Sequence, residues 1–353
     1  MSIIVSSPYI AGPLPIGDNI DVTNEGRDFA MNETTASQRS RFTVSVEQYA
    51  EYHRNGYLIL RGLLEQQDIA RLQSWTDDIY YGRVTELDHL SRDHAWMKET
   101  AKPERLSSAR MHMPHQHNET AEWGLLHPRL LDVLEALIGP DVLALQSMLF
   151  FNPPGKGGQG WHQDSFYIQT QPDSLIGAWV ALDRADEQNG CLWVAPGSHN
   201  EPIYPPAEAR KGYVHADGRL IRGLEPAKAP SVMDDAINNL SAVAAKYGAS
   251  LPVVLEPGDV LFFHSHLLHR SYRNETADRF RRAYVLHYCN ARSRVPWNGS
   301  NENHILARGR THLPYATPAL GTPLELPAEP ESGSEAESMM VAMPGGDIGM
   351  MEM

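Results

Sequence analysis

Short apolar runs of β-type composition follow one another between residues 142 and 289, and turn-forming residues separate them. A closed β-sandwich or jelly roll accommodates many short strands better than a parallel α/β sheet does. The dipeptide Asn189-Gly190 also predicts a tight hairpin, because both residues tolerate a positive φ. We expect strands at residues 142–151, 165–170, 175–182, 191–195, 253–255, 260–264 and 283–289.

Helical patterns dominate the first third of the chain. Ser45 and Gln48 fit a capping box at the start of a helix, and Gly56 ends that helix. Apolar residues at helical spacing predict two further helices, and we expect all of these helices to pack on one side of the sheet-rich core. The remaining expected elements are a strand at residues 57–60 and helices at residues 64–79 and 128–138.

Composition divides the chain into three parts. Residues 1–40 are rich in Gly, Pro, Ser, Asn and Asp and predict a flexible N-terminal arm, and residues 316–353 predict a flexible, acidic tail that contains methionines. Residues 41–315 are expected to form a single domain. Residues 201–250 interrupt its β pattern with an insertion that carries a helix at 231–247 and is long enough to be a lid. The alternative is a surface excursion with no role at the site.

The charge balance limits the partners of this protein. The 353 residues carry a net charge of −14, and seven of the acidic residues follow Arg310, after which no Lys or Arg occurs. A nucleic acid or an anionic membrane would call for a basic patch, so we expect neither as a partner. Cys191 and Cys289 are expected to be buried thiols of a reduced protein. Because we find no signal peptide and no apolar run of about 18 residues, we expect a cytoplasmic protein.

Candidate metal ligands occur in two segments of the β-rich region. His162 and Asp164 are separated by one residue, and on an extended backbone such residues point to the same face. A third ligand can come from a downstream cluster that contains His264, His266 and His269. Two histidines and one carboxylate form the triad that holds non-haem Fe(II) and leaves three coordination positions open. O2 needs one of these positions, and a bidentate keto acid takes the other two.

A keto acid of this kind ends in a second carboxylate, which needs a permanently charged partner. Arginine suits this task, because its planar guanidinium can hold both carboxylate oxygens. The sequence offers Arg279, Arg281 and Arg282 downstream of the histidine cluster. Adjacent residues of a strand point to opposite faces, and Arg281 shares its parity with the apolar Ala283 and Val285. This parity favours Arg281 on the inner face, although a bulge would reverse it.

Several further motifs occur together with these candidates. Taken in their order along the chain, they resemble the phytanoyl-CoA dioxygenase family of Fe(II)/2-oxoglutarate-dependent oxygenases over roughly residues 43–290. The motifs are Tyr52-x-x-Asn55-Gly56-Tyr57, Trp161-His162-Gln163-Asp164, Ala178-Trp179-Val180-Ala181-Leu182, Asn189-Gly190-Cys191-Leu192, Pro196-Gly197-Ser198-His199, Gly258-Asp259-Val260-Leu261-Phe262-Phe263-His264, His269-x-Ser271, Arg281-x-Ala283 and His287-Tyr288.

The resemblance implies a double-stranded β-helix, or jelly roll, with iron held by His162, Asp164 and His269. It selects His269 over the other histidines of the downstream cluster, because the family places the distal ligand in the His-x-Ser element. It also implies a set of cosubstrate residues. In this set Arg281 pairs with the 2-oxoglutarate carboxylate, Ser271 donates to it, and Trp179 packs beside it. We expect Gln146 to face the same cavity from a neighbouring strand.

The activity that the resemblance implies is that of an oxidoreductase that uses Fe(II), 2-oxoglutarate and O2. It would release succinate and CO2 and hydroxylate an aliphatic C–H bond of a small-molecule or acyl substrate. Because Asp164 is present in place of Ala or Gly, hydroxylation is favoured over halogenation. Arg270 stands where the family usually has Gly, and the spacing from His269 to Arg281 is longer by one residue, which weakens the choice of Arg281. The long insertion at 201–250 leaves the substrate open.

Two other classes of function remain as alternatives. A non-catalytic jelly roll could bind a metal as a ligand sensor or an assembly module, but it would have no reason to keep Ser271, Arg281 and Trp179 together. A hydrolase could use the same three metal ligands with zinc, which would leave the arginine unexplained. The oligomeric state does not follow from the sequence.

Overall fold

The computed structural model describes residues 40–84, 110–204, 213–214, 220–221, 240–297 and 301–325. The arm expected at residues 1–40 therefore lies outside the described residues except for its last residue. Most of the insertion, residues 205–239, also lies outside them apart from the short strands β6 (Tyr213–Val214) and β7 (Leu220–Ile221).

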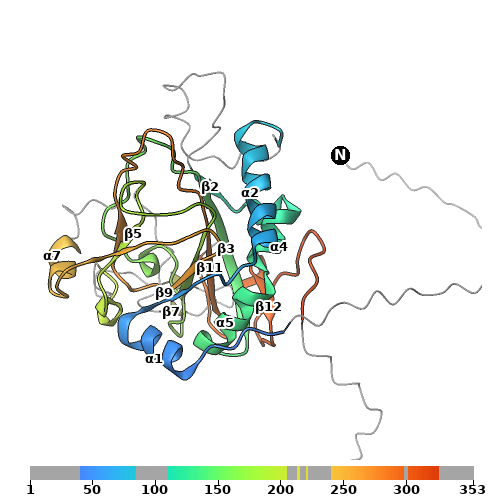
Figure 1. Cartoon of the computed structure of the whole chain (residues 1–353). Coiled ribbons are helices and arrows are strands. Elements are labelled where there is room, and N and C mark those ends of the chain that lie inside the picture. The colour runs from blue at the N-terminus through green and yellow to red at the C-terminus, as the bar shows by residue number, and fades with distance from the viewer. Residues whose placement is uncertain are drawn as a thin grey trace, which may run out of the picture. The chain divides into compact units, whose positions relative to one another are not determined.

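Two antiparallel sheets form the core of residues 41–325, as the expected jelly roll requires (Figure 1). The larger sheet has the order β1-β9-β4-β11-β3-β12, with β2 also paired to β3, and the smaller has the order β10-β5-β8. The strands of the larger sheet are β1 (Tyr57–Leu60), β2 (Arg110–His112), β3 (Val142–Phe150), β4 (Ile176–Ala181), β9 (Val260–His264), β11 (Ala283–Asn290) and β12 (Ile305–Arg308). Those of the smaller sheet are β5 (Leu192–Val194), β8 (Leu251–Val253) and β10 (His269–Ser271).

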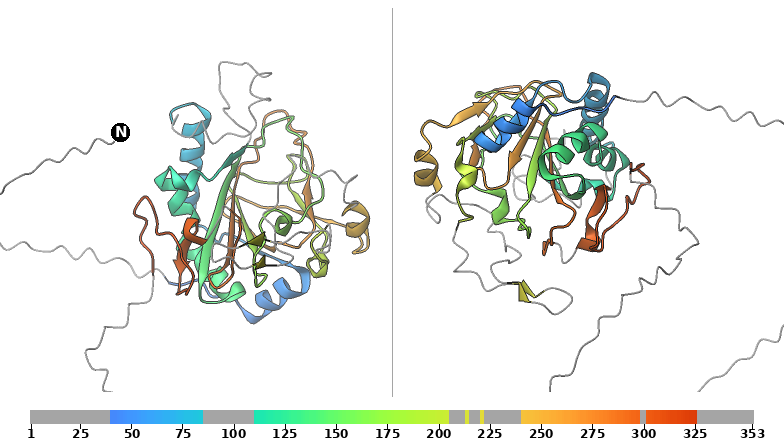
Figure 2. Two further views of the ribbon diagram at one scale, coloured as in Figure 1. Left: turned by 180° about the vertical axis from the view of Figure 1, so that it is seen from behind. Right: turned by 90° about the horizontal axis from the view of Figure 1, so that it is seen from below.

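Helices pack against one face of the larger sheet, which confirms the expected arrangement (Figures 1 and 2). Leu72, Trp75 and Leu134 of the helices share one buried cluster with sheet residues such as Tyr284. Among the described residues, no helix combines the length and the apolar character needed to cross a membrane. The helices on this side are α2 (Gln66–Tyr80), α4 (Glu119–Leu125) and α5 (Pro128–Ile138), whereas α1 (Val46–Asn55) lies apart from α2 and α4, next to β1, and contributes Tyr52 to the same cluster. Short 3-10 helices are η2 (Pro114–Gln116), η3 (Asp164–Phe166), η4 (Ser198–Asn200) and η6 (Asn301–Asn303).

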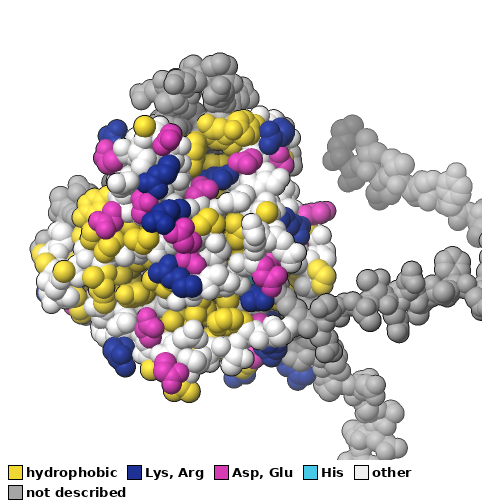
Figure 3. All heavy atoms as spheres, viewed as in Figure 1, with side chains coloured by type: hydrophobic (Ala, Val, Ile, Leu, Met, Phe, Trp, Pro, Cys, Tyr) yellow, Lys and Arg dark blue, Asp and Glu magenta, His cyan; other side chains and the backbone are white. Residues whose placement is uncertain are grey.

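Charges of both signs are mixed on the face of the protein that Figure 3 shows. The Lys and Arg side chains on this face alternate with Asp and Glu side chains, and apolar side chains lie between them. On the described residues of this face the basic side chains do not gather into one patch of the kind that binds a nucleic acid. The absence of a nucleic-acid or membrane partner stays a prediction.

The alternation of side chains along β11 separates the helix side from the interior between the sheets. Tyr284 and Tyr288 point to the helices, where their hydroxyls donate to the carbonyls of Ala121 and Leu125 at 2.7 Å. Val285 belongs to a second buried cluster, which residues of both sheets share. The inner face of β11 therefore lines the space between the two sheets, and residues of the same parity as Val285 are directed into it.

Local capping signals predicted the helices well. Ser45 and Gln48 form both hydrogen bonds of the capping box, and Gly56 ends α1 in the left-handed conformation with φ 81°. The helix expected at 231–247 is present in the described residues as α7 (Leu240–Ala245), which ends two residues earlier than expected. Both cysteines are free and buried, as expected.

The strand expected at residues 165–170 is wrong. The 3-10 helix η3 occupies the start of this segment. The amide groups of Tyr167 and Ile168 both donate to the carbonyl of Asp164, at 2.9 and 3.0 Å. A local hydrogen-bonded turn therefore replaces the cross-strand bonds that the apolar composition suggested.

The hairpin expected at Asn189-Gly190 is also wrong, because β4 and β5 lie in different sheets. The Asn189 side chain instead accepts a hydrogen bond from the Asp186 amide at 2.8 Å, and Cys191 donates to the Asp186 carbonyl at 2.9 Å. Gly190 does adopt a positive φ of 83°. The dipeptide therefore makes a turn, but this turn belongs to a connection that carries the chain from one sheet to the other.

The described residues after 315 do not leave the body of the protein. We call residues 316–325 the C-terminal strap. The amide of Leu320 and the hydroxyl of Thr322 donate to the buried Glu122 carboxylate, at 3.1 and 2.7 Å, and Leu324 packs on the helix-side core. The boundary expected at residue 316 is therefore too early, and residues 326–353 of the expected tail lie outside the described part of the chain.

Truncation at two points tests the role of the C-terminal strap. Deletion of residues 319–353 removes the donors that satisfy the fully buried Glu122. An unsatisfied buried acceptor costs about 1–3 kcal/mol, so this truncation should lower the free energy of unfolding by about that amount. Deletion of residues 326–353 keeps these donors and should change it little. Urea unfolding of both truncated proteins measures the difference, and equal stabilities would contradict a structural role for the strap.

Candidate metal centre

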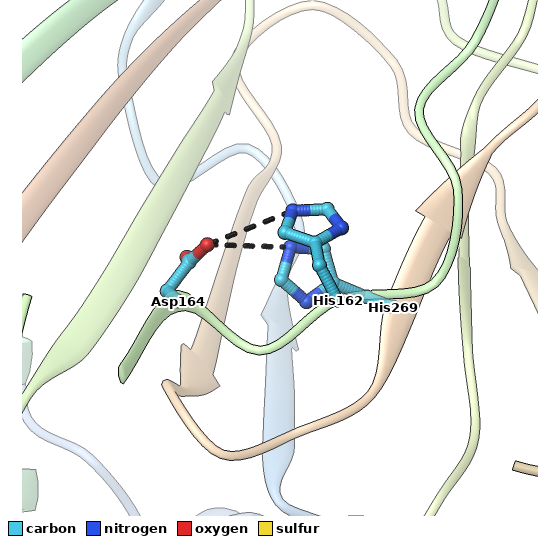
Figure 4. Close-up of side chains that lie close together, drawn as sticks. All are labelled: His162, Asp164 and His269. Atoms are coloured by element: carbon cyan, nitrogen blue, oxygen red, sulfur yellow. Dashed lines mark ion pairs between the residues drawn. The ribbon is translucent and has the colours of Figure 1, made fainter. Parts of the chain in front are cut away.

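His162, Asp164 and His269 come together between the two sheets (Figure 4). His269 is the first residue of β10, and His162 forms an isolated β-bridge with it through two backbone hydrogen bonds of 3.0 and 3.2 Å. Gln163 has an extended backbone with φ −123° and ψ 131°. The side chains of His162 and Asp164 therefore project to the same side, although Asp164 itself already begins η3.

The three side chains offer a compact set of ligand atoms. The Nε2 atoms of His162 and His269 each lie 3.7 Å from Oδ1 of Asp164. One ligand atom from each of the three residues lies within 4.8 Å of the others, and all three residues are buried. Two imidazole nitrogens and one carboxylate oxygen at this separation fit a first-row divalent metal such as iron.

Hydrogen bonds fix the orientation of both imidazoles. Nδ1 of His162 donates to the carbonyl of Gly160, and Nδ1 of His269 donates to the carbonyl of Leu267, each at 2.9 Å. A proton on Nδ1 leaves a lone pair on Nε2, which is the atom that faces Asp164. The backbone thus holds each ring with its free nitrogen directed at the centre.

The charge states of the ligands also suit a metal. Burial, together with the neighbouring His269, lowers the pKa of His162 to about 3, so this ring is neutral near pH 7. Burial raises the pKa of Asp164, but the imidazoles of His269, His287 and His162 lower it more, and the net shift is downward. Asp164 therefore presents a negative charge and His162 a neutral nitrogen donor, which are the states that metal binding requires.

The other two histidines of the downstream cluster make different contacts. Nε2 of His266 lies 2.9 Å from Oδ2 of Asp173. Nδ1 of His264 accepts a hydrogen bond from the amide of His266 at 3.1 Å. Neither residue joins the three converging side chains described above.

Arg281 lies inside the barrel without a carboxylate partner among the described residues. It is 4% exposed, its guanidinium carbon lies 5.5 Å from the centre of the Trp179 ring, and its Nε has no hydrogen-bond partner in the described part of the chain. Burial lowers the pKa of Arg281 to about 10, so the side chain stays charged near pH 7. A buried cation without a counterion is costly, and such a group is suited to binding an anion.

The two other candidate arginines are already paired. Arg279 donates to Asp186 at 2.7 Å, and Arg282 donates to Asp183 at 2.8 Å. Arg282 also reaches Asp77 of α2 on the helix side. Of the three arginines, Arg281 is thus the one whose guanidinium has no carboxylate within ion-pair distance in the described residues.

Ser271 and Gln146, which the sequence analysis assigned to the cosubstrate, are both buried. Ser271 lies two residues after His269 in β10, so the two side chains share a face, and its hydroxyl accepts a hydrogen bond from the amide of Gln159 at 3.1 Å. Gln146 pairs with His287 across β3 and β11, and its amide nitrogen lies 3.1 Å from Nδ1 of His112.

His287 is a residue of the centre that the sequence analysis did not single out as part of the site. Its Nε2 lies 2.9 Å from Oδ2 of Asp164, and the residue is buried. His287 has the same parity in β11 as Val285, and this parity was the one sequence signal that placed His287 on the inner face. Contact with Asp164 could not be inferred from that parity, because it joins segments 123 residues apart.

Gln163, between the two upstream ligands, attaches the metal centre to the start of the insertion. Its amide nitrogen donates to the carbonyls of Pro202 and His266, at 3.1 and 3.0 Å, and its oxygen accepts from the amide of Tyr204 at 3.0 Å. The described start of the insertion therefore lies beside the metal centre. A lid role of the insertion stays a prediction.

His304 is a buried histidine outside the centre, and it provides a test of acid stability. It is fully buried, stacks on Trp297, and has no partner at either ring nitrogen among the described residues. Burial lowers the pKa of His304 from 6.5 to about 4. The unfolded chain then binds a proton that the folded chain does not, so stability is lost as the pH falls from about 6.5 towards 4, by about 2 kcal/mol at pH 5.

Replacement of His304 with phenylalanine should remove this contribution. Between pH 7 and pH 5, the His304→Phe variant should lose about 2 kcal/mol less stability than the unsubstituted protein does. Urea unfolding at the two pH values measures the change. An identical pH dependence in both proteins would show that His304 is not kept neutral by the fold.

Comparisons with known proteins agree with this centre and this fold. A profile of the family described as Phytanoyl-CoA dioxygenase (PhyH) matches residues 52–283. Peroxisomal phytanoyl-CoA dioxygenase of Bos taurus is 28% identical over 274 residues, which cover 76% of this chain and 75% of that protein. The protein of the same name from Mus musculus is 30% identical over 254 residues, which cover 69% of this chain and 68% of that protein.

Two solved structures share the fold of this chain. The non-haem alpha ketoglutarate dependent carbocyclase SnoK from nogalamycin biosynthesis has a TM-score of 0.50 at 16% identity and covers 72% of this chain and 89% of that chain. The non-haem monooxygenase ThoJ has a TM-score of 0.50 at 21% identity and covers 77% of this chain and 87% of that chain.

The family profile spans more than half of the sequence, from α1 to the start of β11. This chain therefore belongs to the phytanoyl-CoA dioxygenase family, whose members are iron(II)- and 2-oxoglutarate-dependent dioxygenases that use O2.

Proposed function

We propose that this protein hydroxylates an aliphatic C–H bond of a small-molecule or acyl substrate and converts 2-oxoglutarate to succinate and CO2 in the same cycle. In this proposal His162, Asp164 and His269 hold the iron, and Arg281 binds the distal carboxylate of 2-oxoglutarate. The observation that carries it is the presence, within one barrel, of a buried triad of metal ligands and a buried arginine without a counterion among the described residues.

Packing supports a common interior for the triad and the arginine. The Phe263 ring lies 4.9 Å from the ring of His269, and Phe263 belongs to the same buried cluster as Trp179. Trp179 in turn contacts the guanidinium of Arg281. A molecule bound at Arg281 would therefore share the inner surface of the barrel with the metal centre.

The donor set fits iron, which would supply the chemistry that protein side chains lack, namely activation of O2 together with the keto acid. The protein side chains would bind the iron and the cosubstrate, orient the substrate and exclude water. His162 and His269 present their Nε2 atoms, and Asp164 presents the negative charge. Since Asp164 keeps its carboxylate, no coordination position is vacated for a halide, which favours hydroxylation.

Arg281 and Ser271 are suited to bind the cosubstrate together. The guanidinium stays charged and can donate to both oxygens of a carboxylate. The Ser271 hydroxyl accepts from the amide of Gln159, so its own proton remains free to donate. We propose Trp179 as the wall that packs beside the cosubstrate, and Gln146 as a further polar contact on the inner face.

The proposed class of substrate rests on the relatives. The mammalian proteins are named for phytanoyl-CoA, and this likeness supports an acyl substrate. Arg270 stands where the family usually has Gly. Its guanidinium carbon lies 4.1 Å from the ring centre of Tyr272 and 5.6 Å from that of Trp161. The cytoplasmic location stays a prediction, and the two relatives have peroxisomal in their names.

A turnover assay tests this function. The protein is incubated with Fe(II), ascorbate, 2-oxoglutarate and O2 in the presence of acyl-CoAs, free acids, amino acids or natural-product alcohols. We expect at least one of these classes to raise succinate release above the level without substrate and to give a hydroxylated product. A non-catalytic metal-binding jelly roll predicts no succinate, and a zinc hydrolase predicts product formation without 2-oxoglutarate or O2.

A further inference from the structure

The two oxygens of the Asp164 carboxylate have different neighbours. Oδ1 faces the Nε2 atoms of His162 and His269, at 3.7 Å from each. Oδ2 lies 2.9 Å from Nε2 of His287, on the inner face of β11. One oxygen is thus directed at the metal position, and the other accepts a hydrogen bond from a separate strand.

The tautomer of His287 follows from this contact. An ionised carboxylate can only accept, so Nε2 of His287 must carry the proton and donate it to Asp164. Nδ1 of His287 has no hydrogen-bond partner within the described ranges. Because His287 is 4% exposed, water does not compete freely for the donor, and the hydrogen bond to Asp164 is the contact that fixes the ring.

The register of β11 explains how the imidazole reaches the carboxylate. His287 is paired with Gly177 on β4 and with Gln146 on β3. The pairing with β3 shifts between His287 and Tyr288, which places an irregularity directly after the imidazole. Such irregularities re-aim side chains next to active sites, and here the inner residue before the shift points at the metal ligand.

We propose that His287 is a positioning residue that keeps Asp164 as a one-oxygen ligand. The inference rests on the proposed function, because it concerns the iron that the triad would hold. A carboxylate can bind a metal through one oxygen or through both. Two imidazoles and one oxygen leave three positions open, whereas two imidazoles and both oxygens leave two. The keto acid would fill both of these, and O2 would have no position left.

Nitric oxide, a stable probe for the position that O2 would use, tests this role without any primary substrate. The Fe(II) and 2-oxoglutarate complex is formed without oxygen, and its charge-transfer absorption band is recorded. Nitric oxide is then titrated in, and the electron paramagnetic resonance signal of the iron nitrosyl is measured. The variants are His287→Phe, which removes the donor, and His287→Gln, which restores an N–H donor.

A neighbouring residue supplies a matched control. Tyr288→Phe changes the next position of β11 and removes a buried hydrogen bond to Leu125 on the helix side, away from the metal centre. We expect Tyr288→Phe to bind nitric oxide as the unsubstituted protein does. His287→Phe should keep the charge-transfer band but bind nitric oxide about 10- to 100-fold more weakly, which is the typical effect on metal affinity or activity of losing an outer-shell partner. His287→Gln should recover most of the difference.

Three results would overturn the inference. Unchanged nitric oxide binding in His287→Phe would show that the third open coordination position of the iron does not depend on the hydrogen bond from His287 to Asp164. A loss in His287→Gln equal to that in His287→Phe would exclude donation as the cause. Loss of the charge-transfer band in His287→Phe would assign His287 to iron or 2-oxoglutarate binding itself. If instead the unsubstituted protein forms no band, the proposed function fails, and the inference fails with it.

Discussion

Replacement of Asp164 with alanine is expected to abolish iron binding and, with it, all turnover of 2-oxoglutarate. The variant keeps the two imidazoles but loses the one carboxylate that faces both of their Nε2 atoms. Loss of a mere outer-shell partner weakens metal binding about 10- to 100-fold, so loss of a direct ligand should weaken it by at least about 100-fold. Anaerobic calorimetric titration with Fe(II) measures the affinity directly.

Histidine variants extend this test to the other two ligands. His162→Ala and His269→Ala should each show a loss of the same order, because each removes one of the two nitrogens that face Asp164. His264→Ala serves as the control, since this histidine belongs to the downstream segment but lies outside the triad. If His264→Ala lost iron binding and His269→Ala kept it, the ligand assignment would be wrong.

Replacement of Arg281 with alanine is expected to have the second largest effect, on 2-oxoglutarate affinity. The substitution removes the buried guanidinium that has no counterion among the described residues. Truncation of one partner of a buried charge pair costs about 2–4 kcal/mol, which corresponds to an increase of about 30- to 700-fold in the dissociation constant of 2-oxoglutarate. Titration of the Fe(II) charge-transfer band with 2-oxoglutarate measures this constant, while iron binding itself should be retained.

The two neighbouring arginines provide the controls. Arg279→Ala removes an ion pair with Asp186 near the surface, and Arg282→Ala removes pairs with Asp183 and Asp77. Both variants should bind 2-oxoglutarate as the unsubstituted protein does, and Arg282→Ala should lower thermal stability, because it leaves two carboxylates without this partner. A strong loss of 2-oxoglutarate affinity in Arg282→Ala but not in Arg281→Ala would show that Arg282, on the other face of the strand, binds the 2-oxoglutarate carboxylate.

Features that depend on residues close together in the sequence were predictable. The capping box at Ser45 and the terminal Gly56 bounded α1, because both act through local hydrogen bonds and backbone conformation. The spacing of His162 and Asp164 brought two side chains to one side, because only the extended backbone of Gln163 separates them. Strand parity likewise directed Arg281 inwards, where the structure has it buried against Trp179.

Features that depend on pairing between distant segments were not predictable. The apolar run at 165–170 begins as the 3-10 helix η3, because the amides of Tyr167 and Ile168 bond locally to the Asp164 carbonyl and not to a distant strand. The contact of His287 with Asp164 depends on the register of β11 within the large sheet. The C-terminal strap has the composition of a tail, and its backbone amides find partners in distant residues, namely the His304 carbonyl for Ala316 and the Glu122 carboxylate for Leu320 and Thr322.

The most direct test of the central claim is a single-turnover experiment. The protein is loaded without oxygen with Fe(II) and 2-oxoglutarate, the charge-transfer band is recorded, and O2 is then admitted with ascorbate present. The proposed chemistry predicts that the band forms, that it decays on exposure to O2, and that succinate appears in an amount comparable to the protein, whereas Asp164→Ala gives neither band nor succinate. A protein that binds iron but forms no band and no succinate would contradict it.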